Sequence, residues 1–328
     1  MTINLDLAKK YGFYIYPDDV NSIRRIYQEN GLSIYFMEGV VHNIKWLKDL
    51  VNLNSFFYAI IPHWTYPKFF EETAHFLSES FPDQLGLTQI IWMTNTEEQM
   101  HQAHAAGLKA IFCNHNCWLD DNIFKIEESD EGRVYDLTLN CRPETMKNPQ
   151  LAVGIPNLAV IKGINHNKNT YWDLMQLNPA YINEIRLSVP QVAQILNKSK
   201  VGGIFSDKEG ACYSSSEFHL CGLPVLSIPS EGGRDVWFSD DNSIVFTKSS
   251  EGLRFALDEA LRRLITGEFN RNTIRASHIK KSNIFRSEFK ASLQTIFHSR
   301  DIIVDVDSYF EIIFFHKMTK YGDHVYLG

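Results

Sequence analysis

The stretch DKEGACYSSSEFHLCGLPV, residues 207–225, follows an apolar run at residues 201–205. The apolar run predicts a buried strand, and residues 215–221 predict a helix that ends before a glycine. Two glutamates, Glu209 and Glu217, then stand at the end of the strand and within the helix, where both can face one pocket. Ligands of parallel α/β sheets bind at the carboxyl ends of the strands, so we expect a binding site here.

The start of the predicted helix suits an anionic group. Its first backbone amides have no partner inside the helix and carry partial positive charge, and the hydroxyls of Ser214 to Ser216 lie beside them. A carboxylate such as Glu217 can accept hydrogen bonds from two hydroxyls of a ribose or another sugar at once. The stretch therefore favours a ligand that combines phosphate with sugar.

The alternation of strand and helix extends from this stretch in both directions. In the first part of the chain, strands are predicted at residues 33–37, 56–61, 89–94 and 109–113, and helices at 41–51, 68–81 and 97–106. After an acidic connection at 114–132, strands are predicted at 133–140, 159–162, 201–205, 224–228 and 243–246, and helices at 150–157, 190–198, 215–221 and 251–265. This restart predicts two Rossmann-like α/β domains that face each other across a cleft.

The central stretch resembles the E-x7-E motif of GT-B glycosyltransferases (group 1, family 4-like), many of which are retaining enzymes with nucleotide-sugar donors. Gly222-Leu223-Pro224 resembles the family's G-x-P that follows the second glutamate, and Gly232-Gly233 resembles the glycine pair of the next loop. Arg142 and Lys147 keep the spacing of the family's G-R-x-x-x-x-K-G loop. Residues other than glycine replace family glycines at Cys117, Cys141, Asn148 and Ser243.

The resemblance, which covers residues 97–265, implies roles for individual side chains. Glu209 would contact the donor sugar at the reacting carbon, and Glu217 would bind the ribose hydroxyls. Arg142 and Lys147 would hold the donor diphosphate, as a planar fork and a point charge. The other donor-binding candidates are Gly210, Ser214, Ser215, Gly232 and Gly233.

A second catalytic candidate is His63, which follows a predicted strand of the first domain and is expected to face the cleft. Simpler interpretations stay open for all these residues. The glutamates could be ordinary helix charges, Arg142 and Lys147 could be exposed loop charges, the glycines could form a turn, and His63 could be a loop histidine.

The length of 328 residues is short for two full nucleotide-binding domains. We expect an acceptor-side domain at 1–130, a nucleotide-sugar donor domain at 131–268, and C-terminal helices at 269–328 that cross back to the first domain. The first domain is expected to be reduced, with few strands, so a sheet of six or seven strands there would contradict this prediction.

The charge balance argues against a nucleic-acid partner. The chain has 32 basic and 39 acidic residues and a net charge of −7. A solvated helix face is the preferred interpretation of its basic stretch, which consists of Arg271, Arg275, Lys280, Lys281, Arg286 and Lys290.

Five cysteines indicate a reducing compartment rather than a disulfide framework, and no signal segment or membrane span is evident. We expect a cytoplasmic protein, with peripheral contact at the inner face of a membrane left open. A zinc site at residues 113–117 is disfavoured because it needs four ligands, and the one candidate for a second cluster with ligand spacing is Cys212, His219 and Cys221. Neither a metal nor a cofactor is expected.

The predicted function is transfer of a hexose from a nucleotide diphosphate sugar, such as a UDP- or GDP-hexose, to an acceptor hydroxyl in glycan biosynthesis. The partners would be the nucleotide sugar and a carbohydrate, lipid-linked or protein acceptor. Two alternatives stay open. One is a non-catalytic homologue that binds carbohydrate or a partner, which the replaced glycines favour. The other is a sugar-nucleotide epimerase or phosphorylase on the same fold.

Overall fold

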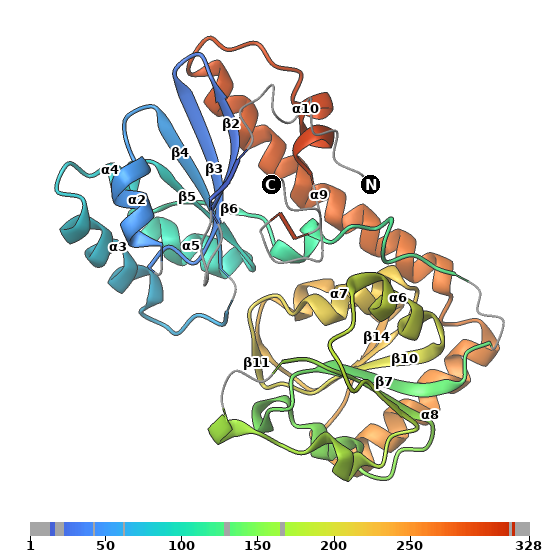
Figure 1. The fold of residues 1–328 in the computed structure, drawn as a ribbon. Coiled ribbons are helices and arrows are strands. Elements are labelled where there is room, and N and C mark those ends of the chain that lie inside the picture. Colours follow the sequence, from blue (N-terminus) through green and yellow to red (C-terminus); the bar gives the residue numbers. More distant parts are fainter. Residues whose placement is uncertain are drawn as a thin grey trace. The chain divides into compact units, whose positions relative to one another are not determined.

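The computed structural model describes residues 14–16, 23–41, 43–61, 63–127, 132–164, 168–314 and 317–318. The chain divides into two compact units (Figure 1). Unit 1 comprises Met1–Asp120 and Ser282–Gly328, and unit 2 comprises Asp121–Lys281. One long helix, α9 (Arg271–His298), contributes to both units. The predicted fold class is confirmed: both units are α/β, and the C-terminal helices pack on the N-terminal unit.

The described part of unit 1 contains a sheet in the order β1-β2-β3-β4-β5-β6, in which β3 to β6 are parallel and β1 and β2 are antiparallel additions at one edge. The strands are β1 (Tyr14–Tyr16), β2 (Ile23–Glu29), β3 (Leu32–Glu38), β4 (Ser55–Ile60), β5 (Ile90–Thr94) and β6 (Lys109–Phe112). The helices between them are α2 (Ile44–Leu50), α3 (Phe69–Ser80), α4 (Leu85–Thr88) and α5 (Glu97–Ala105).

The six strands show that the prediction of few strands in a reduced first domain is wrong. One of the two additional strands, β2, belongs to a hairpin whose turn, Asn30-Gly31, joins it to β3 with φ of 52° and 75°. Asn-Gly is the usual pair of a two-residue hairpin turn, because both positions need positive φ. The turn signal is thus present in the sequence, although the strand before it was not predicted.

The C-terminal segment completes the core of unit 1. Helices α2, α3 and α5 lie on one face of the sheet, where Phe57 of β4 belongs to the same hydrophobic cluster as Leu47 and Leu77. The other face is covered by α9 and by α10 (Val306–Ile313), since Phe289 packs against Tyr58 with ring centroids 4.6 Å apart. Because the helices between the strands cover one face only, the other face is left for the C-terminal helices. This explains why the last described residues of the chain belong to the first unit.

Most cations of α9 bind other parts of the chain, so the expected solvated helix face is corrected. Arg275 donates hydrogen bonds to three backbone carbonyl oxygens at 2.5–2.6 Å. Arg286 donates to the carbonyl oxygens of Cys117 and Leu119 at 2.8 and 3.0 Å, and Lys290 pairs with an aspartate of α10 at 2.8 Å. The first of the C-terminal helices expected at 269–328 forms as one element, α9, and these contacts hold it along much of its length.

The connection predicted at 114–132 contains the boundary between the two units, which lies between Asp120 and Asp121. It is not polar throughout, because Trp118 and Phe124 are fully buried. The C-terminal helices expected at 269–328 continue after α9 with the helix Val306–Ile313, and residues 315–316 and 319–328 lie outside the described residues.

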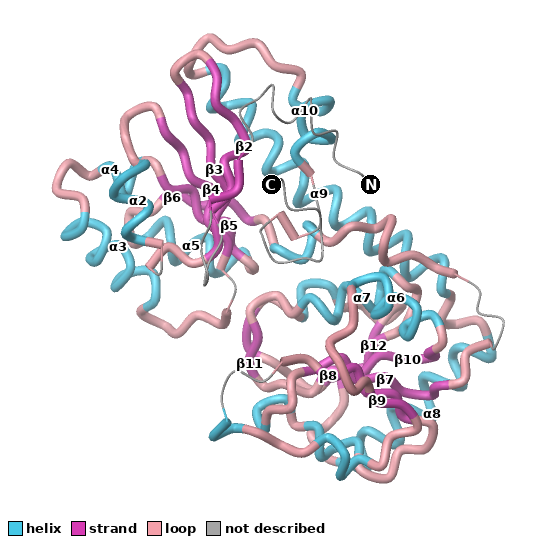
Figure 2. The backbone as a smooth tube through the Cα atoms, viewed as in Figure 1, coloured by secondary structure: helices cyan, strands magenta, loops and turns pink. Residues whose placement is uncertain are grey.

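The described strands of unit 2 gather in a main sheet (Figure 2). This sheet is parallel throughout, in the order β14-β12-β10-β7-β8-β9. Its strands are β7 (Tyr135–Cys141), β8 (Leu158–Lys162), β9 (Tyr181–Ile182), β10 (Ser199–Ile204), β12 (Val225–Ser227) and β14 (Ser243–Val245). A separate short pair consists of β11 (Lys208–Glu209) and β13 (Glu231–Gly232). The α-helices before α9 are α6 (Val189–Asn197), α7 (Tyr213–Leu220) and α8 (Ser250–Thr266).

Short 3-10 turns complete the two units, at His115–Trp118, Thr145–Lys147, Pro149–Ala152, Lys168–Thr170, Leu174–Leu177 and Asp235–Trp237. The helix predicted at 150–157 is one of these turns, and β9 was not predicted. Within the ranges that the structure describes, no helix is both long and apolar enough to cross a membrane.

The strand order of unit 2 reverses between β7 and β10. From β7 the chain proceeds outward to β8 and β9, and then returns to β10 on the other side of β7. Loops that follow the two central strands therefore diverge and leave space between them. Such a switch point is where open α/β sheets bind their ligands. We therefore expect the ligand-binding site at the loops after β7 and β10.

Candidate functional site

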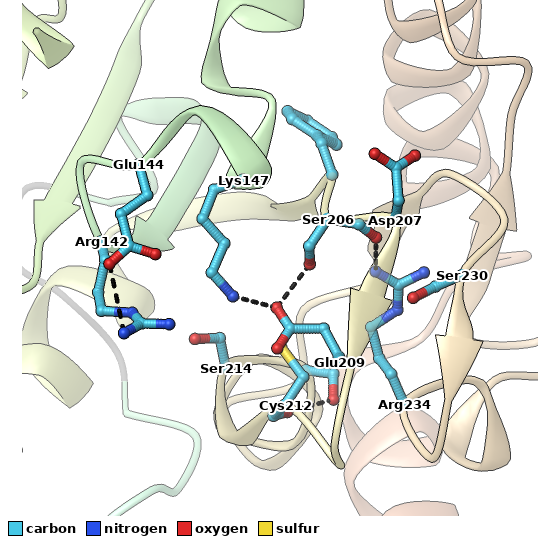
Figure 3. Close-up of polar contacts among 12 residues, drawn as sticks. Arg142, Glu144, Lys147, Ser206, Asp207, Glu209, Cys212, Ser214, Ser230 and Arg234 are labelled. Carbon is cyan, nitrogen blue, oxygen red and sulfur yellow. Dashed lines mark hydrogen bonds and ion pairs between the residues drawn. The ribbon is translucent and has the colours of Figure 1, made fainter. Parts of the chain in front are cut away.

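The two loops at the switch point are joined by an ion pair. Lys147, in the loop after β7, donates a hydrogen bond from Nζ to Oε1 of Glu209, at the end of the loop after β10 (Figure 3). The side chains are 13% and 14% exposed, respectively. The structure therefore brings together the lysine and the first glutamate of the two sequence motifs, which lie on different loops.

The carboxylate of Glu209 has a second hydrogen-bond donor. The hydroxyl of Ser206, two residues after the end of β10, donates to the same Oε1 at 2.5 Å. Burial acts to raise the pKa of Glu209, but the positive charge of Lys147 and the hydrogen bonds from Lys147 and Ser206 outweigh it, so the pKa is lowered. Glu209 is thus held as an anion in a largely buried position.

This lowered pKa predicts a pH-dependent contribution to stability. A carboxyl group with a lower pKa in the folded state stabilises the fold above its unfolded pKa, about 4.3, and loses that effect as the pH falls through its folded value. We expect Glu209→Gln to unfold at lower urea concentration than the wild type at pH 7, with a smaller difference at pH 3. Equal differences at both pH values would contradict the ionised pair.

A second link ties the same two loops together. Asn148 follows Lys147 with a φ of 46°, and its Nδ2 donates to the carbonyl oxygen of Phe205 at 2.7 Å and to Oδ2 of Asp207 at 3.0 Å. Asn148 stands where the resembling family has glycine. Asparagine tolerates this left-handed conformation, and here its side chain also adds two hydrogen bonds. Asn148 can therefore maintain the conformation of the loop that carries Lys147 without a glycine at this position.

The glycine pair shapes the backbone of Glu209. Gly232 has a φ of 115° and pairs with Glu209 between β11 and β13. A Cβ atom at Gly232 would lie 1.7 Å from the carbonyl oxygen of Glu209. The N–H of Gly233 donates to the carbonyl oxygen of Gly210 at 2.6 Å. These contacts give the three glycines a structural role. Their contact with a nucleotide-sugar donor stays a prediction.

A buried arginine, Arg234, stabilises the backbone near Glu209 through hydrogen bonds. Arg234 is 0% exposed, and its guanidinium donates to the carbonyl oxygens of Ser206 and Ile228 at 3.0 and 2.7 Å. These carbonyls follow β10 and β12, so Arg234 ties the ends of two strands. Sequence reasoning did not select Arg234, and its position after the glycine pair is a weak signal for this role.

The second glutamate of the motif lies on α7 and is 5% exposed. Its Oε2 accepts a hydrogen bond from Nδ2 of Asn140 at 2.7 Å. Ser214 donates from Oγ to the carbonyl oxygen of Asn140 at 2.9 Å. Ser215 is fully buried, and its hydroxyl donates to the carbonyl oxygen of Cys212 at 2.7 Å, within its own turn. The hydroxyl of Ser215 is therefore directed at the backbone, and its contact with a nucleotide-sugar donor stays a prediction.

Arg142 is the most exposed of the candidate cations, with 43% of its side chain accessible. Its NH1 lies 3.3 Å from Oε1 of Glu144, which is buried, so Glu144 restrains the guanidinium (Figure 3). Arg142 and Lys147 come from one loop and together can supply two positive charges to a diphosphate.

His63 belongs to unit 1, whereas the other candidates belong to unit 2. Its Nδ1 lies 2.9 Å from the carbonyl oxygen of Trp64, and its ring packs edge-on against Phe69 at 5.6 Å. These contacts are local. The catalytic role of His63 stays a prediction.

Several residues of the site were missed, among them Asn140, Asn148 and Ser206. Ser206 immediately follows an apolar strand, and Asn140 is a polar residue near the end of one, so position at a strand end was an available signal. In the portion of the chain described, no group of three or more His, Cys, Asp or Glu side chains is arranged to hold a metal ion.

Solved structures resemble the chain over most of its length. HepE from Anabaena, in a complex with UDP, is 13% identical, with a TM-score of 0.54 over 74% of this chain and 72% of HepE. The pneumococcal O-GlcNAc transferase GtfA, in a complex with UDP and GlcNAc, is 14% identical, with a TM-score of 0.52 over 87% of this chain and 70% of GtfA. TarM is 14% identical, with a TM-score of 0.52 over 84% of this chain and 63% of TarM.

No family model and no curated protein matches the sequence. The likeness therefore rests on the structure alone, that is, on two α/β units that each contain a largely parallel sheet. At these identities it shows the fold alone: the chain is similar to GT-B glycosyltransferases in architecture.

Proposed function

We propose that the chain is a glycosyltransferase that moves a hexose from a nucleoside diphosphate sugar to the hydroxyl of a carbohydrate, lipid-linked or protein acceptor, with retention of configuration. The observation that carries the proposal is the Lys147–Glu209 ion pair at the switch point of unit 2. It joins a cation suited to a diphosphate with a carboxylate suited to sugar hydroxyls. Ligand complexes of similar structures support it, since HepE and GtfA both carry UDP.

The chemistry requires stabilisation of a leaving group. The bond between the anomeric carbon and the β-phosphate oxygen breaks, and the diphosphate leaves with the electron pair. The acceptor oxygen forms the new bond to the anomeric carbon, and its proton passes to a phosphate oxygen. Lys147 and Arg142 would stabilise the negative charge that develops on the diphosphate. The remaining task of the protein is to hold both reactants in position.

The ion pair also suggests how the site changes when the donor binds. A lysine ammonium has three N–H donors, so Lys147 can contact a diphosphate while it releases or shares Glu209. The carboxylate of Glu209 is then able to accept hydrogen bonds from the hydroxyls of the hexose. We propose that the pair is the resting state of the site, and that the donor exchanges the partner of each side chain.

Ligand-dependent thermal unfolding of the full chain tests the proposal. We expect UDP or a UDP-hexose to raise the melting temperature, because a ligand at about 100 times its dissociation constant stabilises by about 2.7 kcal/mol. The buffer contains EDTA, since Arg142 and Lys147 are proposed to supply the charges without a metal ion. GDP and ADP serve as comparison nucleotides. The absence of a shift with any of the three would contradict the proposal.

Product analysis separates transfer from the alternatives. Incubation of a UDP-hexose with the protein and a panel of acceptors should release UDP only together with a glycosylated acceptor. Isomerisation of the hexose without an acceptor would indicate an epimerase. Formation of a sugar phosphate when inorganic phosphate is added as the reactant would indicate a phosphorylase. Binding without turnover of any kind would favour the non-catalytic homologue.

A further inference from the structure

Helix α7 is fastened to the end of β7 by two hydrogen bonds to one residue. Ser214 donates to the main-chain oxygen of Asn140 at 2.9 Å, and the side-chain amide of Asn140 donates to Oε2 of Glu217 at 2.7 Å. Ser214 and Glu217 are three residues apart in a helix, so they lie on the same face. Asn140 therefore fixes both the start of α7 and the carboxylate of Glu217.

The alternation of β7 places Asn140 on the face toward α7. Leu137 and Leu139 point into the hydrophobic core of unit 2, and Cys141 packs against that core. Successive side chains of a strand point to opposite faces, so Thr138 and Asn140 share the other face. An asparagine at this position can form a hydrogen bond to the helix, whereas an apolar residue could not.

The hydrogen bond from Asn140 orients the carboxylate of Glu217. A carboxylate that is 5% exposed needs hydrogen-bond donors to remain ionised. The side-chain amide of Asn140 is one such donor, at 2.7 Å from Oε2. A carboxylate has about four acceptor positions, so the bond from Asn140 does not by itself prevent Glu217 from accepting a hydrogen bond from a ribose hydroxyl.

We propose that Asn140 is a positioning residue that presents Glu217 to the ribose of the donor nucleotide, and that it thereby sets the preference for ribonucleotides over deoxyribonucleotides. The inference rests on the proposed function and deepens it, because it assigns ribose selection to a residue outside the motifs. Asn140 itself does not need to touch the nucleotide.

Calorimetric titration of the full chain with paired nucleotides tests this inference. The probes are UDP, GDP and ADP, each with its 2′-deoxy and 3′-deoxy counterpart. The variants are Asn140→Leu, which keeps the size of the side chain, and Asn140→Ala, which guards against a misfolded leucine variant. The matched control is Thr138→Val, which removes a hydrogen bond of 2.5 Å to Ser199 from the same face of the same strand.

In the wild type, we expect loss of a ribose hydroxyl to weaken binding about tenfold, as for a hydrogen bond to a charged group. In both Asn140 variants, the ribose and deoxyribose affinities should converge to within about twofold. This convergence should arise from weaker binding of the ribonucleotide, while the affinity for the deoxyribonucleotide stays constant. Thr138→Val should keep the wild-type ratio. A purely structural role of Asn140 would weaken both members of a pair alike.

The inference is overturned if the Asn140 variants keep the tenfold ratio, or if Thr138→Val loses it as well. Both results leave the proposed function intact, because the wild type still binds a nucleoside diphosphate. Failure of the wild type to bind any of the three ribonucleotides would instead overturn the proposed function, and the role of Asn140 with it.

Discussion

Replacing Lys147 with methionine is expected to lower kcat/KM for hexose transfer by about two to three orders of magnitude, the usual cost of removing one group that stabilises transition-state charge. The variant loses the cation nearest to Glu209, which is 14% exposed and then has a weaker counter-charge. The uncompensated carboxylate also repels the donor diphosphate. We therefore expect weaker UDP binding as well as slower transfer, measured by calorimetry and by initial rates.

The chain offers a close control for this experiment. Lys200 donates to Oδ1 of Asp136 at 2.7 Å, so it joins the same two strands, β10 and β7, at their amino-terminal ends. Lys200→Met removes an ion pair of the same type at the opposite ends of the same two strands, and it should leave kcat/KM unchanged. Equal losses in both variants would show that Lys147 acts through stability. Full activity of Lys147→Met would refute its role at the diphosphate.

Much of the fold could be predicted because its elements are local. The strands at β3 to β6 and the helices α3, α5 and α8 follow from short apolar runs, helical periodicity and end signals. For example, Thr96 is a residue type that favours helix starts, and its side chain accepts a hydrogen bond from the N–H of Gln99 and caps α5. The contacts of α9 could not be predicted in this way. Arg275 binds carbonyls of residues 121 and 124, more than 150 positions away in sequence.

The candidate site shows the same division between local and distant information. The motifs place Lys147 and Glu209 on separate loops, but their contact depends on β7 and β10 being neighbours, which is a property of the strand order. Hydroxyl directions were not predictable either, since Ser214 and Ser215 are adjacent and donate to different segments. Periodicity indicates the face of a residue, whereas its hydrogen-bond partner depends on the tertiary structure.

Replacing Gly232 with alanine is expected to destabilise unit 2 by about 3 kcal/mol and to abolish transfer. Two costs add at this position. The φ of 115° is unfavourable for any residue with a Cβ atom, and that atom would lie 1.7 Å from the carbonyl oxygen of Glu209. Because this neighbour is backbone, relief requires β13 to separate from β11. Glu209 then moves, and a displacement of about 1 Å can cost 10²-fold in rate.

A second glycine of unit 2 separates these two costs. Gly267 ends α8 with a φ of 80°, and an added Cβ would meet nothing within 4 Å. Gly267→Ala should therefore cost about 1 kcal/mol, from its backbone conformation alone, and should leave transfer unchanged. Urea unfolding and initial rates of the two variants measure the difference. If Gly232→Ala were no less stable than Gly267→Ala, β13 would not be packed against the backbone of Glu209. If it lost stability but kept full transfer activity, the position of Glu209 would not limit the reaction.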